Sequence, residues 1–366
     1  MHLYSLYYLT TTFEMKKYFL SLLFFVLTLG FSLNAQDIHF SQYNLTPMLI
    51  NPAQAGAYKD FEFIANYKTQ WTSISPNAYK TMMFSYDSRL MQQKWKTKWL
   101  AVGFNIYSDK AGDGNMGTTE ALASIGYHTM LNNKNTLGGC LFGGYAQRSI
   151  NYANLTWDEQ YQNGIYSSSN SSGETLLQNN NKFGYPDFGM GVLYQYSKGQ
   201  MYSTANDMIV VHAGLSLFHL NNPKYSYYNS SEKLYTKIVG HADVLIGIKN
   251  TNFALMPGII YMQQGPSTEI YPGCFFRYML KEQSKFTGYV KGASIMFGTH
   301  FRTSTINSDA FVPSIQLEVA EYTIGVSYDM NISGLKTATS GMGGFEISLR
   351  YGNPSPFLYK SAASFQ

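Results

Sequence analysis

Apolar and polar side chains alternate at every second residue from about residue 60 to the C-terminal part of this chain. In residues 345–351, for example, Phe345, Ile347 and Leu349 alternate with polar neighbours. A β-strand sends successive side chains to opposite faces of its sheet. Each such stretch therefore predicts a strand with one apolar and one polar face. A soluble β-sandwich buries the apolar face, whereas a transmembrane β-barrel turns it to lipid and keeps polar groups in the lumen.

Composition favours the membrane barrel over the sandwich. Charged residues make up 13% of the chain, which is low for a soluble protein of this size, and aromatic residues make up 16%, which is high. Beyond the N-terminal region no apolar stretch has the length of a membrane-spanning helix, so insertion would have to use strands. The net charge of +4 comes without a large basic cluster, which excludes nucleic acid as an expected partner.

The alternating segments predict an all-β fold, a transmembrane antiparallel β-barrel of about fourteen strands. An even number is what a bacterial barrel with both ends in the periplasm requires. Longer expected connections fall after every second strand. They lie near residues 72–77, 109–117, 150–182, 220–234, 303–309 and 330–342, and tighter ones such as 131–135 and 249–252 lie between them. Residues 263–267 are a short exception on the long-loop side.

Targeting signals divide the chain into segments. The basic start at Met15, the apolar run 18–31 and the small residue Ala35 have the features of a secretory signal peptide. We therefore expect residues 1–14 to be an upstream extension from a misplaced start codon and residues 15–35 to be a cleaved signal peptide. An irregular N-terminal segment (36–57), the outer-membrane barrel (58–352) and a C-terminal tail (353–366) would follow.

Aromatic residues gather near strand ends and predict interfacial girdles, in which a ring lies at the membrane boundary and a polar tip reaches water. Ordinary strand enrichment in aromatics is the alternative. The candidates are Trp71, Trp95, Trp99, Tyr107, Tyr127, Tyr261, Tyr271, Tyr278, Tyr322 and Tyr351.

Short motifs occur in order along the whole mature chain. They include the segment from Gln36 to Tyr43, Asn51-Pro52-Ala53-Gln54-Ala55-Gly56, the stretch 65–71, the stretch 109–114 and residues 325–329. Together they resemble the PorP/SprF family of type IX secretion system outer-membrane proteins. The resemblance implies a barrel that works with the machinery exporting adhesins and enzymes. In gliding bacteria, the resemblance implies that the barrel works with the surface adhesin that is moved along the cell. Members of the family are often paired with one large secreted protein.

The N-terminal segment is polar and broken by Pro47 and Pro52, so it does not read as a strand. Because it precedes the first strand, we expect it to start on the periplasmic side. It could be a plug inserted into the lumen or a periplasmic contact for partner subunits. Charges of both signs on the polar faces could pair across the lumen, or they could be scattered, hydrated pore charges. The plug or lumen candidates are His39, Gln42, Asn51, Glu62, Lys68, Gln70, Asp87, Arg148, His212, His241, Asp243, Arg302, Glu318, Glu346 and Arg350.

Two long polar connections are candidates for partner binding. Residues 151–181 are rich in Ser and Asn, and residues 221–233 carry several tyrosines, which suit a protein or glycan surface. The candidate residues are Trp157, Tyr161, Tyr225, Tyr227 and Tyr228. Solvated loops without a partner are the alternative.

No motif points to catalysis, a cofactor or a metal. Asp109, Asp113 and Glu120 match a calcium loop poorly, and Cys140 and Cys274 have no ligand partners nearby for a zinc site. The two cysteines fall on separate strand-like segments and are too few to staple an exported domain, so both are expected to be unpaired wall residues, with a disulfide as the alternative. The predicted function is a non-enzymatic outer-membrane barrel that anchors or assists export of a secreted adhesin or cargo protein. Its expected partners are that protein, periplasmic secretion or motility components and outer-membrane lipid. The alternative is a diffusion channel for small or apolar solutes, and an outer-membrane hydrolase is a weaker one.

Overall fold

The computed structural model describes residues 37–174, 181–199, 206–228, 231–281, 292–304, 308–334 and 336–354. The segments predicted as residues 1–14, the signal peptide 15–35 and the tail beyond Pro354 lie outside these residues. No helix among the described residues is long and apolar enough to cross a membrane.

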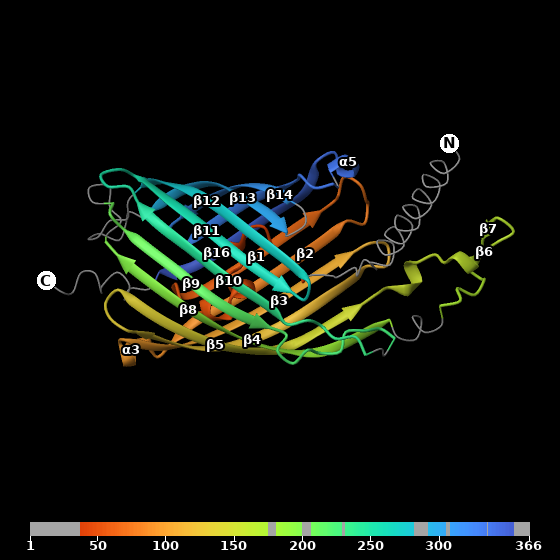
Figure 1. Ribbon diagram of the computed structural model, residues 1–366, viewed down its shortest axis with the longest axis horizontal. Coiled ribbons are helices and arrows are strands. Elements are labelled where there is room, and N and C mark those ends of the chain that lie inside the picture. Colours follow the sequence, from red (N-terminus) through yellow and green to blue (C-terminus); the bar gives the residue numbers. More distant parts are fainter. Residues whose placement is uncertain are drawn as a thin grey trace, which may run out of the picture. The chain divides into compact units, whose positions relative to one another are not determined.

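Fourteen strands of the described chain form one closed antiparallel barrel (Figure 1). Neighbours in sequence pair with one another, and the first strand closes the barrel against the last. The fold class predicted from the alternation is therefore confirmed. The barrel strands are β1 (Lys59–Gln70), β2 (Tyr79–Leu90), β3 (Lys98–Ala111), β4 (Met116–Met130), β5 (Asn135–Ser149), β8 (Lys182–Lys198), β9 (Ile209–Phe218), β10 (Lys237–Gly247), β11 (Phe253–Gln264), β12 (Ser267–Lys281), β13 (Ala293–Ser304), β14 (Ser308–Val319), β15 (Tyr322–Asn331) and β16 (Met342–Pro354).

Small elements occupy the connections and the N-terminal segment. The short strands β6 (Tyr161–Gln162) and β7 (Ile165–Tyr166) pair as a separate hairpin between β5 and β8. The helical turns are η1 (Tyr43–Leu45), α2 (Pro47–Ile50), η2 (Pro52–Gln54), α3 (Gln92–Trp95), η3 (Tyr152–Asn154), η4 (Asp158–Gln160) and α5 (Lys336–Thr339).

Apolar side chains point outward and polar ones inward, as a lipid-embedded barrel requires. In β16 the side chains of Phe345 and Ile347 are 42% and 41% exposed. The alternating residues Glu346 and Ser348 are 1% and 0% exposed. The same alternation fills β15 from end to end. The wall is therefore a barrel with an oily outer surface and a polar inner one.

The two ends of the barrel carry different connections. We call the end with connections 150–181 and 219–236 the outer end, because bacterial barrels place their longer loops outside the cell. The inner end carries the start of β1 and α3. Sorting by length is only partial, since residues 265–266 form a tight turn at the outer end, whereas β12 and β13 are joined by the longer connection 282–292 at the inner end.

Three of the predicted girdle residues were placed wrongly. Trp99, Tyr107 and Tyr271 have exposed fractions of only 2%, 8% and 2% and face the barrel interior. In β3 the outward positions are the even ones, including Phe104 and Ile106, so the odd-numbered Trp99 and Tyr107 point inward. The alternation of side chains along the strand, and not the preference of aromatic rings for the membrane boundary, therefore determines where these residues point.

Candidate functional site

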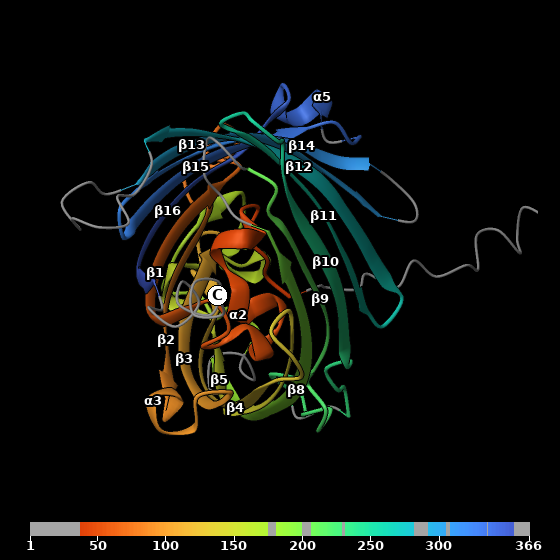
Figure 2. The same cartoon turned by 90° about the vertical axis from the view of Figure 1, so that its left-hand side faces the viewer.

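Residues 37–57 lie inside the barrel. Figure 2 looks along the barrel from the end that carries α3 and shows the segment with α2 enclosed by the ring of strands. Leu45 and Asn51 are both fully buried, as is most of the segment. Pro47 and Pro52 begin the short helical turns α2 and η2, where a missing backbone N–H costs nothing. The Asn51 side chain caps η2 by accepting a hydrogen bond of 2.9 Å from the Ala53 N–H.

Strands β1 and β16 bind residues 41–44 of this segment. Glu346 accepts hydrogen bonds from the backbone N–H groups of Ser41 (2.7 Å) and Gln42 (3.0 Å). The Lys68 ammonium donates to the Ser41 hydroxyl (2.9 Å), and Arg350 donates to the Asn44 carbonyl (2.8 Å). An irregular peptide has unpaired backbone groups, and these wall side chains satisfy them in place of water.

The opposite wall binds the middle of the segment. Asn51 donates to the Val192 carbonyl of β8 (2.9 Å), and its amide nitrogen lies 3.2 Å from Nε2 of His241 on β10. Ser216 on β9 donates to the Ile50 carbonyl (2.6 Å). The segment is thus held from both sides of the lumen.

The end of the segment is fixed at the inner end of the barrel. Asp87 accepts a hydrogen bond from the Gly56 N–H (2.7 Å). The Gly56 carbonyl in turn accepts from Arg89 Nε (2.6 Å) and Trp99 Nε1 (3.0 Å). Trp99 stacks on His128 with ring centres 5.2 Å apart. Trp99 and Arg89 therefore serve the segment and not the lipid boundary.

The start of the segment is fixed at the outer end. Asp37 pairs with His219 (2.6 Å) and lies 3.6 Å from Lys237, and its backbone N–H donates to Gln264 (2.9 Å). His219 also lies 2.9 Å from Asp187. Burial alone would lower the pKa of His219, but the two carboxylates raise it to about 10. The segment was expected to start on the periplasmic side. In the structure the chain runs through the lumen from the outer to the inner end before it enters β1, so Asp37 lies at the end opposite to the start of β1.

Several buried charges in the wall form ion pairs. Asp329 lies between Lys68 (3.4 Å) and Arg302 (3.2 Å), and Arg302 also contacts Asp309 (2.5 Å). Glu62 pairs with Arg350 at 3.2 Å. Burial makes an unpaired charge costly, so these pairs fix the side chains that surround the segment.

Wall glycines leave room for the segment. A methyl group at Gly191 would collide with Asn51 and Pro52, and one at Gly325 would collide with Gln42 and Leu45. At Gly214 it would meet Asn51 and His241. The wall and the segment are therefore complementary in shape as well as in hydrogen bonding.

Some of the predicted lumen residues lie apart from the segment. Asp243 pairs with His212 (2.8 Å), and Glu318 pairs with Arg277 (2.7 Å). Arg148 lies at the outer end, 5.0 Å from the centre of the Tyr225 ring, and Gln70 is half-buried at the end of β1. Of the remaining lumen candidates, Glu62 and Arg302 pair with other wall residues. The others lie on the segment or contact it, namely His39, Gln42, Asn51, Lys68, Asp87, His241, Glu346 and Arg350. His39 does so through a 3.8 Å approach to Glu269 and a carbonyl that accepts from Lys68.

The predicted partner residues differ in accessibility. Tyr161 and Tyr228 are exposed, with fractions of 54% and 52%. Trp157 is half-buried and stacks on Tyr152. Tyr225 and Tyr227 pack edge-on against Phe183 at the outer end, with centroid distances of 5.5 and 4.8 Å. The last two belong to an aromatic cluster at the barrel mouth.

Sequence reasoning missed several residues that bind the segment. Asp329, the partner of Lys68 and Arg302, and Tyr271, whose hydroxyl donates to the Ser41 carbonyl (2.9 Å), both sit at inward positions of their strands. Both could have been predicted, because they occupy the alternate strand positions that face the lumen. Asp37 and His219 carried no such signal, since neither belongs to a strand.

Neither cysteine is paired with the other, and Cys140 is buried while Cys274 is half-buried. In the described part of the chain, no group of three or more His, Cys, Asp or Glu side chains is arranged to hold a metal ion. The arrangement of the lumen is that of a peptide-binding cavity occupied by the chain's own N-terminal segment.

A family model described as type IX secretion system membrane protein PorP/SprF matches residues 32–351. No curated protein matches the sequence. Among solved structures, the chain is similar to the TodX deltaS2S3 mutant monoaromatic hydrocarbon channel, with 9% identity, coverage of 84% of this chain and 94% of that chain, and a TM-score of 0.48. It is also similar to BamA from Haemophilus ducreyi lacking POTRA domains 1-3, with 8% identity, coverage of 80% and 70%, and a TM-score of 0.38.

Proposed function

Because this chain belongs to the PorP/SprF family of type IX secretion system membrane proteins, we propose that it is a closed, non-enzymatic anchor in the outer membrane. In this proposal it holds, or assists the export of, a secreted adhesin or cargo protein at its outer end, and it contacts periplasmic secretion or motility components at its inner end.

The filled lumen is the observation that carries this proposal. Residues 37–57 run through the barrel and are bound by β1 and β16 on one side and by β8, β9 and β10 on the other. A secreted protein cannot share this space with the segment. We therefore place the partner at the rim and assign the segment the role of a resident plug.

The outer rim offers the partner an accessible surface. Connection 150–181 carries the hairpin β6–β7, in which the exposed Tyr161 packs against Tyr166 with ring centres 5.3 Å apart. Exposed tyrosines supply apolar area with a polar tip, a composition enriched at protein interfaces. Together with Tyr228 they are the residues that we expect the partner to cover.

Two measurements test the proposal. In planar bilayers the full-length mature protein should give no large, steady single-channel current, whereas such a current would favour the diffusion channel. In cells, replacing residues 161–166 by a Gly-Ser linker of equal length should abolish surface display of the cognate secreted protein. The same replacement in turn 131–134 at the inner end is the control. Unchanged display with a folded barrel would rule out the hairpin as the binding surface.

A further inference from the structure

Two lysines lie side by side on neighbouring strands, on the membrane side of the outer end. Lys80 on β2 and Lys110 on β3 are directly paired in the strand register, and both are exposed. They occupy outward positions, because the inward positions of β2 and β3 are the odd ones. Like charges directly opposite one another destabilise a sheet unless an anion lies between them.

No acidic side chain compensates these lysines. Neither ammonium group forms an ion pair or hydrogen bond with a residue that the structure describes. The register places Thr69 of β1 beside Lys80 and Gly117 of β4 beside Lys110. The row of outward positions across these four strands therefore carries two positive charges and no negative one.

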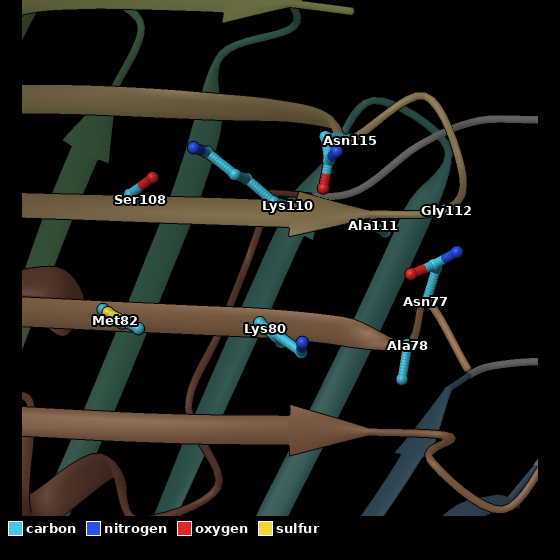
Figure 3. Close-up of a pocket in the computed structure, with 9 residues that line it drawn as sticks. All are labelled: Asn77, Ala78, Lys80, Met82, Ser108, Lys110, Ala111, Gly112 and Asn115. Carbon is cyan, nitrogen blue, oxygen red and sulfur yellow. The ribbon is translucent and has the colours of Figure 1, made fainter. Parts of the chain in front are cut away.

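The lysines line a hollow in the barrel surface (Figure 3). Met82 and Ser108, the next outward pair toward the inner end, lie at the left of the lysines in Figure 3 and line the hollow on that side. Asn77 and Asn115 lie at its other side, in the connections at the outer end. The hollow thus combines two lysine ammonium groups with asparagine amides, a serine hydroxyl and the apolar side chain of Met82.

The height of this hollow matches the lipid headgroups of the outer leaflet. From the outward pair Leu90 and Leu100 at the inner end, ten residues of β3 lead to Lys110. At about 3.4 Å per residue and a tilt of about 40°, these residues span about 26 Å along the barrel axis. The apolar band of such barrels is about 25 Å tall, so the lysines lie at its outer edge.

We propose that Lys80 and Lys110 form a binding site for the phosphate group of an outer-leaflet glycolipid. The two ammonium groups bind the phosphate, the side chains of Asn115 and Ser108 contact its sugar, and Met82 packs against the first part of an acyl chain. This site is independent of the lumen and of the secreted partner.

Native mass spectrometry of the full-length mature protein tests the site. The probe is a bisphosphorylated glycolipid of the lipid A type, with the same lipid lacking phosphate and inorganic phosphate as separate arms. The variant Lys80→Gln/Lys110→Gln should bind the phosphorylated glycolipid about 30-fold more weakly than the parent protein, as expected for the loss of two lysines at an anionic surface. Lys80→Arg/Lys110→Arg should restore binding.

The control is Lys94→Gln/Lys98→Gln, which removes the same charge at the inner end and should leave binding unchanged. Heat-dependent gel mobility checks that each variant is folded. Equal binding by the Lys80→Gln/Lys110→Gln variant would overturn the proposal, as would equal binding of the glycolipid without phosphate. Binding of inorganic phosphate as tight as that of the glycolipid would overturn the assignment to a lipid.

Discussion

The Glu346 carboxylate of the last strand accepts a hydrogen bond of 2.7 Å from the backbone N–H of Ser41, which lies 305 residues earlier in the chain. The same carboxylate accepts a second hydrogen bond from the next residue. Each of the two carboxyl oxygens thus accepts one backbone N–H of the segment. This contact therefore joins the N-terminal segment to the strand that closes the barrel.

Glu346→Ala should loosen the N-terminal segment without opening the wall. It leaves two buried N–H groups without acceptors, which costs about 3 kcal/mol or more. Hydrogen exchange of the backbone amides at residues 40–45, read by mass spectrometry, should rise strongly. Glu318→Ala, which breaks the pair with Arg277 in the wall, is the matched control and should leave this exchange unchanged. Equal effects of the two variants would contradict the role of Glu346.

Gly191→Val should displace the segment by steric collision. The new side chain would occupy the position of Asn51 and Pro52, at a cost of about 1–3 kcal/mol for overpacking. We expect transient channel openings in planar bilayers that the parent protein lacks. Gly139→Val tests the general effect of a bulkier strand residue, because Gly139 is partly exposed at an outward position of β5 and a Cβ added there meets no atom closer than 3.9 Å. A silent Gly191→Val barrel with full protection of residues 48–55 would count against the plug.

The ion pair between His219 and Asp37 should give the start of the segment a dependence on pH. The pKa of His219 is raised to about 10, above the value of about 6.5 for an unfolded histidine. Its contribution to stability is therefore complete below pH 6.5, declines above it and disappears as the pH passes about 10. Hydrogen exchange at residues 37–42, corrected for the intrinsic rate, should increase between pH 7 and pH 10.

The variant His219→Gln supplies the comparison for this measurement. It should exchange faster than the parent protein at pH 7 and show no such increase toward pH 10, since only Lys237 and Gln264 then hold Asp37. If the parent protein and the variant showed the same pH profile, the ion pair would not hold the segment.

The path of the segment predicts which side of the membrane its start occupies. Asp37 contacts residues at the outer end, whereas Gly56 contacts residues at the inner end. An epitope inserted directly before Asp37 should therefore be accessible to antibody on intact cells. An epitope in turn 131–134 should become accessible only after the outer membrane is permeabilised. Accessibility of both epitopes only after permeabilisation would contradict the outer position of Asp37.

Within the strands, the sequence predicted which individual side chains point into the barrel, because odd and even positions of a strand face opposite sides. Glu62, Lys68, Asp87 and Glu346 were assigned to the polar face and are buried inside the barrel. Trp99 and Tyr271 were assigned to the lipid boundary because an aromatic preference was weighed above the same parity, and they lie inside. Parity is the stronger guide, because a shift by one residue would turn a whole strand inside out.

The barrel with lipid outside could be predicted from the amino-acid sequence, because alternation with a period of two is a local property that each strand carries independently. That the lumen is filled, and from which end, became known only from the folded chain. The irregular residues 37–57 have no periodicity, and their partners, such as Glu346 for Ser41 and His219 for Asp37, are brought near only when the barrel closes. Contacts between such distant residues depend on the register of every strand between them, which no local pattern specifies.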